Sequence, residues 1–495
     1  MRLPSRRAGT AAAVLLAAAL GCGHAPAFRC EQRNGRRWRE VRTPHVVLRT
    51  DLGRRAAVAL AEELEVTLTG LSWGLLQRDV TLPGPVDVVA LDSAEGLDRL
   101  LPADTVAGVT PSLWSQPVIV MPGSFDRLQR MVVAHELTHV LLAGWARQPW
   151  WFREGLATYA ETIAWEGSAR RLTLGRIPRH RVRHVFHRPQ GLREILAGGT
   201  DFDADHYATA WALVHFLLNR HPHAFQELQA RFARGEEPRE AWAAEFPLWA
   251  TERPDGPERL ERELRAYLDS DPAAWVFPRP RPGAPAVEER PLGSAEVHDL
   301  RLSLPWLNRG RPVPRDAVLE EIREALSEDP GSPSALALLG ILRGGEEEAL
   351  ARRATELHPD DWRAWLLASI AARDGEPAVR EAALRRAAEL EPRSAPALAE
   401  LAGLLLAAGD VEAAHELAAR AARIAPFSPP FLDTLAATLE ERGRCPEALG
   451  VQRRALDLLG SWPGRHAPVG AAPLVERRDR LEARCGTDAP VAAGP

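Results

Sequence analysis

The chain contains no lysine: of its 495 residues, 62 belong to the Lys and Arg group, and every one of them is arginine. We attribute this bias to codon usage, because no single site explains it. The 67 acidic residues outnumber the arginines and give a formal net charge of −5, which argues against a nucleic-acid-binding protein. No segment is long and apolar enough to span a bilayer as a helix.

Cysteine is also scarce, with only four residues. No two of them stand in a C-x-x-C spacing, so the sequence predicts no cysteine-ligated zinc site. Cys445 and Cys485 fall in the same C-terminal region and are the expected disulfide pair, which fits an oxidising compartment.

The N-terminus has the layout of a signal peptide, residues 1–21. Three arginines precede an apolar stretch, Ala11 to Leu20, that is too short to be a spanning helix. The stretch Ala19-Leu20-Gly21-Cys22 resembles a bacterial lipobox, which implies lipidation of Cys22 and anchoring to a membrane of the cell envelope, and leaves Cys30 as the odd thiol. An ordinary secretory signal, with a secreted product, is the alternative.

The stretch MVVAHELTHVLLAG, Met131 to Gly144, is typical of a buried helix, yet it carries three ionisable side chains. Groups of this kind are costly to bury without partners. His135 and His139 are four residues apart, so both imidazoles project from one helical face and can reach one ion. Glu136 projects beside them, where a carboxylate can accept a proton from a metal-bound water.

A third ligand follows in QPWWFREGLATYAETIAW. Glu154 stands fifteen positions after His139, and Pro149 marks a turn between them. A second helix from about Trp151 that runs antiparallel to the first brings Glu154 over the histidine pair. Three protein ligands with an open fourth position are what a hydrolytic zinc site requires, so one Zn²⁺ per chain is predicted.

HELTH followed by WWFREGLATYAE resembles the gluzincin metallopeptidases, and is closest to the peptidase MA-like group. The resemblance runs over about residues 44–276 and implies that His135, His139 and Glu154 bind zinc, with Glu136 as the general base. Thermolysin and the alanyl-type aminopeptidases have more residues between the second histidine and the glutamate. The specificity residues of those families therefore have no counterparts here.

Two supporting roles complete the predicted site. Glu161, two helical turns after Glu154, is expected to orient a ligand histidine. Gluzincins commonly supply a tyrosine or histidine that steadies the oxyanion, and both His206 and Tyr207 are available. Tyr207 is our candidate because it lies on the apolar face of the helix predicted over Asp201 to Arg220; a core tyrosine is the alternative.

The predicted fold class is α+β: a thermolysin-like, gluzincin metallopeptidase domain with a mixed sheet and active-site helices, followed by an all-α solenoid. HVVLRT, PVDVVALD and QPVIVMP are expected strands, with a helical segment at Leu52 to Leu76 between the first two. QPVIVMP, just before the zinc helix, either borders the cleft and pairs with substrate or is an internal strand.

A basic stretch with histidines but no interleaved carboxylate is predicted to be a solvated loop rather than a second metal site. Its histidines are His180, His184 and His187.

A repeat follows a proline-rich linker that starts at Phe277. Prolines recur at intervals of 29, 33 and 34 residues, each with an alanine five positions before it: Pro330, Pro359, Pro392 and Pro426, with Ala325, Ala354, Ala387 and Ala421. The phase continues to Ala455. The best copy, LAELAGLLLAAGDVEAAHELAARAARIAP, resembles a tetratricopeptide repeat (TPR), which implies three to four stacked helix pairs that bind a protein partner.

These patterns predict six segments: signal peptide 1–21, tether 22–43, gluzincin domain 44–276, linker 277–314, TPR-like repeats 315–465, and a C-terminal cap and tail 466–495. The expected function is zinc-dependent hydrolysis of a peptide or protein substrate in the bacterial cell envelope, with the solenoid recruiting a partner or substrate. The alternative is an envelope scaffold lipoprotein whose solenoid binds partners and whose zinc domain is mainly structural.

Overall fold

The computed structural model describes residues 36–92, 108–111, 117–124, 126–143, 145, 148–166, 168, 170–178, 191–197, 203–270, 272–304, 315–460 and 471–485. The signal peptide, Cys22, Cys30 and the histidines of the basic loop lie outside these residues. Within them, no helix has both the length and the apolar character needed to cross a membrane.

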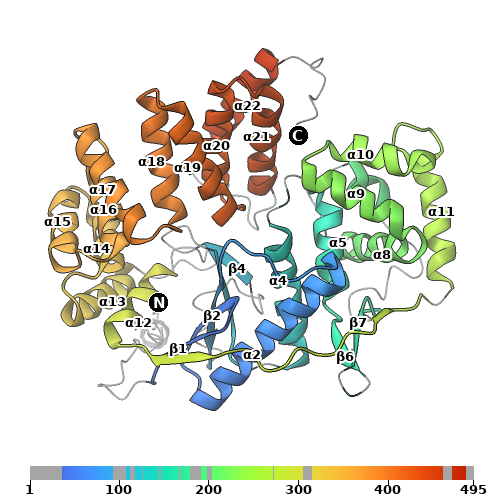
Figure 1. Cartoon of the computed structure of the whole chain (residues 1–495), viewed down its shortest axis with the longest axis horizontal. Coiled ribbons are helices and arrows are strands. Elements are labelled where there is room, and N and C mark those ends of the chain that lie inside the picture. Colours follow the sequence, from blue (N-terminus) through green and yellow to red (C-terminus); the bar gives the residue numbers. More distant parts are fainter. Residues whose placement is uncertain are drawn as a thin grey trace, which may run out of the picture.

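A six-stranded mixed sheet forms the centre of the N-terminal part (Figure 1). Its order is β4-β5-β3-β2-β1-β9, in which β2, β3 and β5 are parallel and the three outer pairings are antiparallel. The strands are β1 (Arg39–Arg42), β2 (Val46–Thr50), β3 (Val86–Leu91), β4 (Gly108–Pro111), β5 (Pro117–Pro122) and β9 (Glu288–Pro291). The three strands predicted from the sequence are β2, β3 and β5.

Both faces of this sheet are covered. Leu48, Val88 and Ile119 pack in one core with α2 (Arg54–Leu71), which continues into the π-helical η2 (Ser72–Leu76), and with α4 (Arg127–Leu142). The opposite face presents buried side chains to α12 (Ser294–Ser303) and the residue after it: Val89, Leu91, Val118 and Val120 pack with Val297 and Leu304. Burial on both faces explains the near-continuous Val and Leu content of the parallel strands.

Two of the predicted segments contribute elements to the sheet. The expected linker contains β9 and α12, and the expected tether contains β1, which lies inside the sheet between β2 and β9. β9, at this edge of the sheet, is held by ion pairs: Glu289 pairs with Arg39 at 2.5 Å and with Arg54 at 2.7 Å. Its sequence does not alternate between apolar and polar residues. A periodicity of hydrophobic residues could therefore not reveal β9.

The strand QPVIVMP is internal. β5 pairs with β3 on one side and with β4 on the other, so both of its edges carry backbone hydrogen bonds. The first of the two alternatives for this strand, direct pairing with substrate, is wrong in this structure. β4 occupies the outer position.

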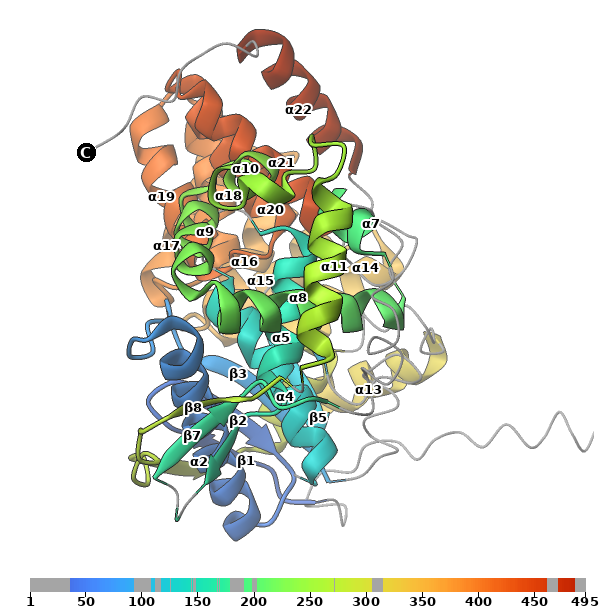
Figure 2. The same ribbon diagram turned by 90° about the vertical axis from the view of Figure 1, so that its right-hand side faces the viewer.

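A helical subdomain and a small sheet extend the core beyond α4. The helices are α5 (Trp150–Ala160), α7 (Leu192–Ala197), α8 (Ala204–Arg220), α9 (Pro222–Arg234), α10 (Pro238–Glu245) and α11 (Gly256–Leu268), with the short η3 (Pro247–Trp249). β6 (Ala164–Glu166), β7 (Arg171–Leu174) and β8 (Trp275–Phe277) form an antiparallel sheet, which lies below α8 in Figure 2. No pattern in the sequence predicted this sheet.

The C-terminal half is a curved stack of antiparallel helix pairs, with α13 (Arg315–Glu328) before them and α22 (Ala471–Cys485) after them (Figure 1). The pairs are α14 (Pro333–Arg343) with α15 (Glu347–Leu357), α16 (Trp362–Ala371) with α17 (Pro377–Leu390), α18 (Ala395–Ala407) with α19 (Val411–Ile424), and α20 (Pro429–Glu441) with α21 (Cys445–Gly460). The phased alanines are all 0% exposed, where their small size lets helices approach: Ala325, Ala354, Ala387, Ala421 and Ala455. The TPR-like repeat is therefore confirmed.

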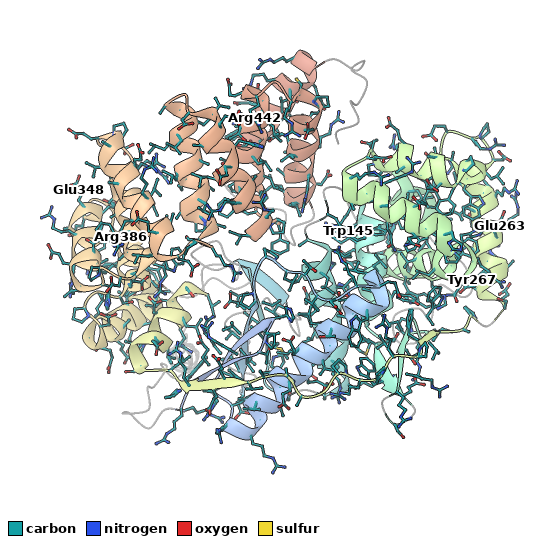
Figure 3. The ribbon with its side chains drawn as sticks, in the orientation of Figure 1. Trp145, Glu263, Tyr267, Glu348, Arg386 and Arg442 are labelled. Atoms are coloured by element: carbon teal, nitrogen blue, oxygen red, sulfur yellow. The ribbon has the colours of Figure 1, made fainter. Side chains whose placement is uncertain are left out.

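The repeats and the sheet line an open cavity of about 930 Å³. Its sheet side carries Arg49 and Asp87, and its repeat side carries Asp361 and Arg363. Trp145, just after α4, lines the same cavity and is labelled in Figure 3 on the side of the helical subdomain that faces the repeats. The cavity therefore lies next to the C-terminal end of α4.

Candidate metal centre

The helices α4 and α5 bring the predicted ligands together. The side chain of Asp126 accepts hydrogen bonds from the backbone N–H groups of Leu128 and Gln129, which caps the N-terminus of α4. The apolar side of α4, including Leu137 and Leu141, packs into the main core. This fixes the face that carries the two histidines.

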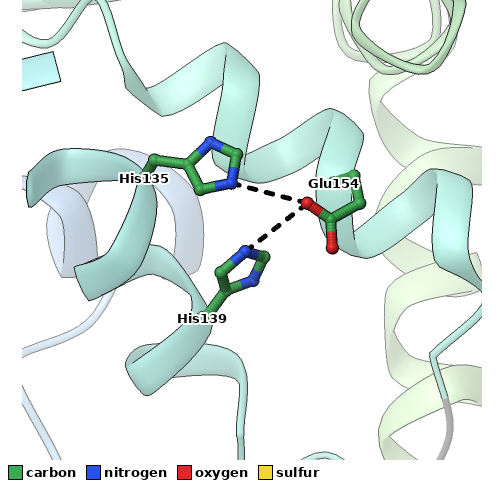
Figure 4. A group of neighbouring side chains, drawn as sticks. All are labelled: His135, His139 and Glu154. Atoms are coloured by element: carbon green, nitrogen blue, oxygen red, sulfur yellow. Dashed lines mark ion pairs between the residues drawn. The ribbon is translucent and has the colours of Figure 1, made fainter. Parts of the chain in front are cut away.

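The three ligand atoms form a compact group (Figure 4). Nε2 of His135 lies 3.4 Å from Oε2 of Glu154, and Nε2 of His139 lies 3.5 Å from the same oxygen. All three ligand atoms lie within 4.8 Å of one another. Tetrahedral zinc with bonds of 2.0–2.1 Å places neighbouring ligand atoms about 3.4 Å apart, so these residues fit a zinc ion.

Partner residues orient two of the three ligands. Oε1 of Glu161 lies 3.0 Å from Nδ1 of His135, which leaves Nε2 of that ring toward Glu154. Nε of Arg153 donates to Oε1 of Glu154 at 3.1 Å, which leaves Oε2 for the histidines. Nδ1 of His139 is buried and has no hydrogen-bond partner within the described residues. The contact predicted for Glu161 is thus present, whereas that of Arg153 was not predicted, although it stands next to Glu154 in the sequence.

The pKa values of His135 and Glu154 show that the ligand group favours a positive charge between its carboxylates. Burial on its own lowers the pKa of His135, but hydrogen bonds with Glu154 and Glu161 and the charges of Glu154 and Glu136 raise it to about 10. Burial on its own raises the pKa of Glu154, but the charge of His139 and hydrogen bonds from both histidines hold it well below its usual range. A protonated imidazole between carboxylates carries the positive charge that a metal ion would otherwise supply.

Glu136 lies on α4 next to His135 and is partly exposed. Its charge acts on His135, and in the part of the chain that the structure describes no hydrogen bond or ion pair engages its carboxylate. The role of Glu136 as a general base stays a prediction.

The two candidates for an oxyanion-stabilising residue differ in their surroundings. His206 is engaged in capping α8: its Nδ1 lies 2.7 Å from Oδ1 of Asp203, and its Nε2 lies 3.0 Å from Oε2 of Glu194. Tyr207 contacts Trp150 edge to face, with ring centroids 4.9 Å apart, and Trp150 is one turn before Glu154 on α5. These positions favour Tyr207 over His206 for a role at the site, and that role stays a prediction.

Cys445, at the start of α21, is disulfide-bonded. Cys485, its predicted partner, ends α22, the helix that follows α21. The pairing itself stays a prediction because the side chain of Cys485 lies outside the described residues.

Residues 131–238 match the model of a family described as "Protein of unknown function (DUF1570)". This segment includes all three ligands and most of the helical subdomain. No curated protein matches the chain.

Solved structures similar to the chain include TTC0263, a thermophilic TPR protein of Thermus thermophilus, with 22% identity over 34% of this chain and 90% of that one and a TM-score of 0.27. MamA protein is 19% identical over 31% of this chain and 88% of its own, with a TM-score of 0.25. Yeast Tom70 is 14% identical over 72% of this chain and 71% of its own, with a TM-score of 0.27. The repeat assignment rests on the chain's own helices and buried alanines. Fold and site together describe a two-part protein, with a three-residue metal-type centre beside a small mixed sheet and TPR-like repeats.

Proposed function

We propose that the chain is a zinc-dependent peptidase of the gluzincin type that acts in the bacterial cell envelope. The observation that carries this proposal is the convergence of His135, His139 and Glu154 at zinc-ligand spacing, with Glu136 beside them. His135 and Glu154 are buried and His139 is partly buried. Such a group is costly to bury unless it serves a purpose such as holding a cation.

Zinc bound there would supply Lewis acidity toward a water molecule and a substrate carbonyl. The chain's own residues would do the remaining work. Glu136 would accept the proton of the attacking water at its carboxylate and then donate it to the leaving amine. Arg153 and Glu161 would hold Glu154 and His135 in their ligating orientations, and Tyr207 would donate to the developing oxyanion.

A second candidate function is a scaffold in which the repeats bind a protein partner and the metal domain is mainly structural. The curved stack of helix pairs supports it, because such stacks present extended concave surfaces to partners. In the peptidase proposal the same repeats recruit a partner or the substrate, so the two functions differ only in whether peptide bonds are cleaved.

Anchoring by lipid on Cys22 belongs to the same proposal. Replacement Cys22→Ser should move the protein from the membrane fraction to the soluble fraction, because in this proposal lipid attached to Cys22 supplies the anchor. If the variant stays in the membrane fraction, another part of the chain holds it there.

The activity is tested by incubating the purified full-length protein with a peptide library derived from a whole proteome. Cleavage is expected with the zinc-loaded protein, to disappear after treatment with a chelator, and to return when Zn²⁺ is added back. A library left intact under all three conditions would contradict the peptidase proposal and favour the scaffold.

A further inference from the structure

A residue of the last repeat pair contacts the helix that carries the two histidines. The guanidinium of Arg454, on α21, donates to the backbone carbonyl of Ala143, the C-cap residue of α4. The same Nη2 atom donates to the carbonyl of Pro426 at 2.9 Å. In Figure 1 the lower end of α21 points toward the region of α4 and α5.

The contact is chemically suited to a helix end. The last carbonyls of an α-helix have no partner within the helix, and they carry the negative end of its dipole. Arg454 supplies both a donor and a positive charge at this point, although 311 residues separate it from Ala143 in the sequence.

Arg454 stands in surroundings that a cation does not favour. Burial lowers its pKa, and the charge of Arg153 lowers it further, to about 10. Within the described residues its guanidinium donates to two carbonyls, and no carboxylate pairs with it. This partly buried guanidinium is thus held by two carbonyl groups, one of which belongs to α4.

From Arg454 two short paths lead to the ligands. Ala143 is one turn after His139 on α4, so the end that Arg454 holds is the end nearest to that ligand. Arg153, whose charge acts on Arg454, donates to Oε1 of Glu154. Trp145 stacks on Phe152 of α5, with ring centroids 5.8 Å apart, and ties the same helix end to the helix of Glu154.

We infer that Arg454 is a positioning residue for the metal centre, through which the last repeat pair holds the C-terminal end of α4 in the orientation that brings His139 to Glu154. This inference rests on the proposed metal centre. It makes the repeats part of the site's architecture, so that a partner bound to the last repeats can alter the centre.

The test uses the full-length chain and measures the zinc dissociation constant by competition with a chromophoric chelator. Arg454→Gln removes the charge and is expected to weaken zinc binding about 10-fold, the effect of losing a residue that supports a metal ligand. Arg454→Lys, which keeps a charge and a donor, should recover part of the loss. The matched control is Arg453→Gln, since Arg453 is its neighbour on α21 and pairs with Glu482 of α22 instead.

A second measurement separates this inference from the proposed function. In metal-free protein, amide hydrogen exchange in the last turn of α4 should be faster in Arg454→Gln than in Arg453→Gln. If the wild-type chain binds no zinc, the proposed function fails, and the exchange measurement still decides the role of Arg454. Equal exchange and equal zinc affinity in the two variants would overturn the inference.

Discussion

Oε1 of Glu161 lies 3.0 Å from Nδ1 of His135, and this contact directs the other ring nitrogen toward Glu154. Both residues are buried, so solvent competes little for the contact. A carboxylate behind an imidazole ligand fixes the tautomer and the ring orientation and makes the ligand more basic.

Replacement Glu161→Ala should therefore weaken zinc binding by about 10- to 100-fold. Glu161→Gln retains an oxygen that can accept from Nδ1 and should weaken binding less. Competition with a chelator measures both constants. Unchanged affinity in the alanine variant would show that Glu161 does not support the ligand.

Loss of a ligand should have a larger effect than loss of its support. Glu154→Ala removes the oxygen that both histidines approach, and two imidazoles alone do not hold zinc well. Metal analysis after dialysis should find one zinc per wild-type chain and almost none in this variant or in His135→Ala. Glu240→Ala, on the exposed side of α10, is the control and should keep its zinc. Full occupancy in Glu154→Ala would remove that residue from the site.

A buried histidine of α8 makes stability depend on pH. His215 is 0% exposed; Oη of Tyr267 donates to its Nδ1 at 2.6 Å, and its Nε2 donates to the carbonyl of Gly175 at 2.8 Å. Burial lowers its pKa from 6.5 to about 4. The folded chain thus binds this proton more weakly than the unfolded chain, so the stabilisation is complete above pH 6.5 and is lost as the pH falls toward 4.

The free energy of unfolding should accordingly fall by up to about 3 kcal/mol between pH 6.5 and pH 4 because of this residue. His215→Gln, which does not titrate, should show a shallower decrease over the same interval, although it is less stable at neutral pH. Denaturant unfolding at several pH values measures both profiles. Parallel profiles would mean that His215 is not the group responsible.

A shortened chain that contains only the N-terminal part should include β9 and α12, because both elements pack on the sheet. A chain that ends at Pro280 lacks both elements and uncovers Val89, Val118 and Val120 on the sheet. It should be less stable than a chain that ends at Leu304 by roughly 5 kcal/mol, since each buried Val or Leu contributes about 1.5–3 kcal/mol. Thermal unfolding of the two shortened chains compares them directly, and equal midpoints would show that α12 contributes nothing to the sheet.

Local patterns in the sequence predicted those parts of the fold that depend on residues close together in the chain. The i, i+4 spacing placed two histidines on one face of α4, and the proline after it predicted the turn to α5. The phased alanines predicted buried contacts between repeat helices, and the apolar runs predicted β2, β3 and β5.

Features with non-local causes were not predictable in the same way. β9 has the sequence EERP, and its side chains form ion pairs with residues about 250 positions away. The strands β6 and β8 have only three residues each, too few to show a period of two. The contact of Arg454 with Ala143 joins residues 311 positions apart. It depends on the curvature of the whole repeat stack, which cannot be predicted from a short stretch of sequence.

The measurement that tests the central claim most directly is the hydrolysis rate of Glu136→Gln on a peptide that the wild-type protein cleaves. Glu136 is not among the three ligands, so zinc content and unfolding temperature should stay close to those of the wild type. The amide cannot accept the proton of the attacking water, so the rate should fall about 100-fold or more, within the range that general-base catalysis supplies. A Glu136→Gln protein that retains its zinc and cleaves at the wild-type rate, or that fully complements a deletion strain, would contradict the peptidase account.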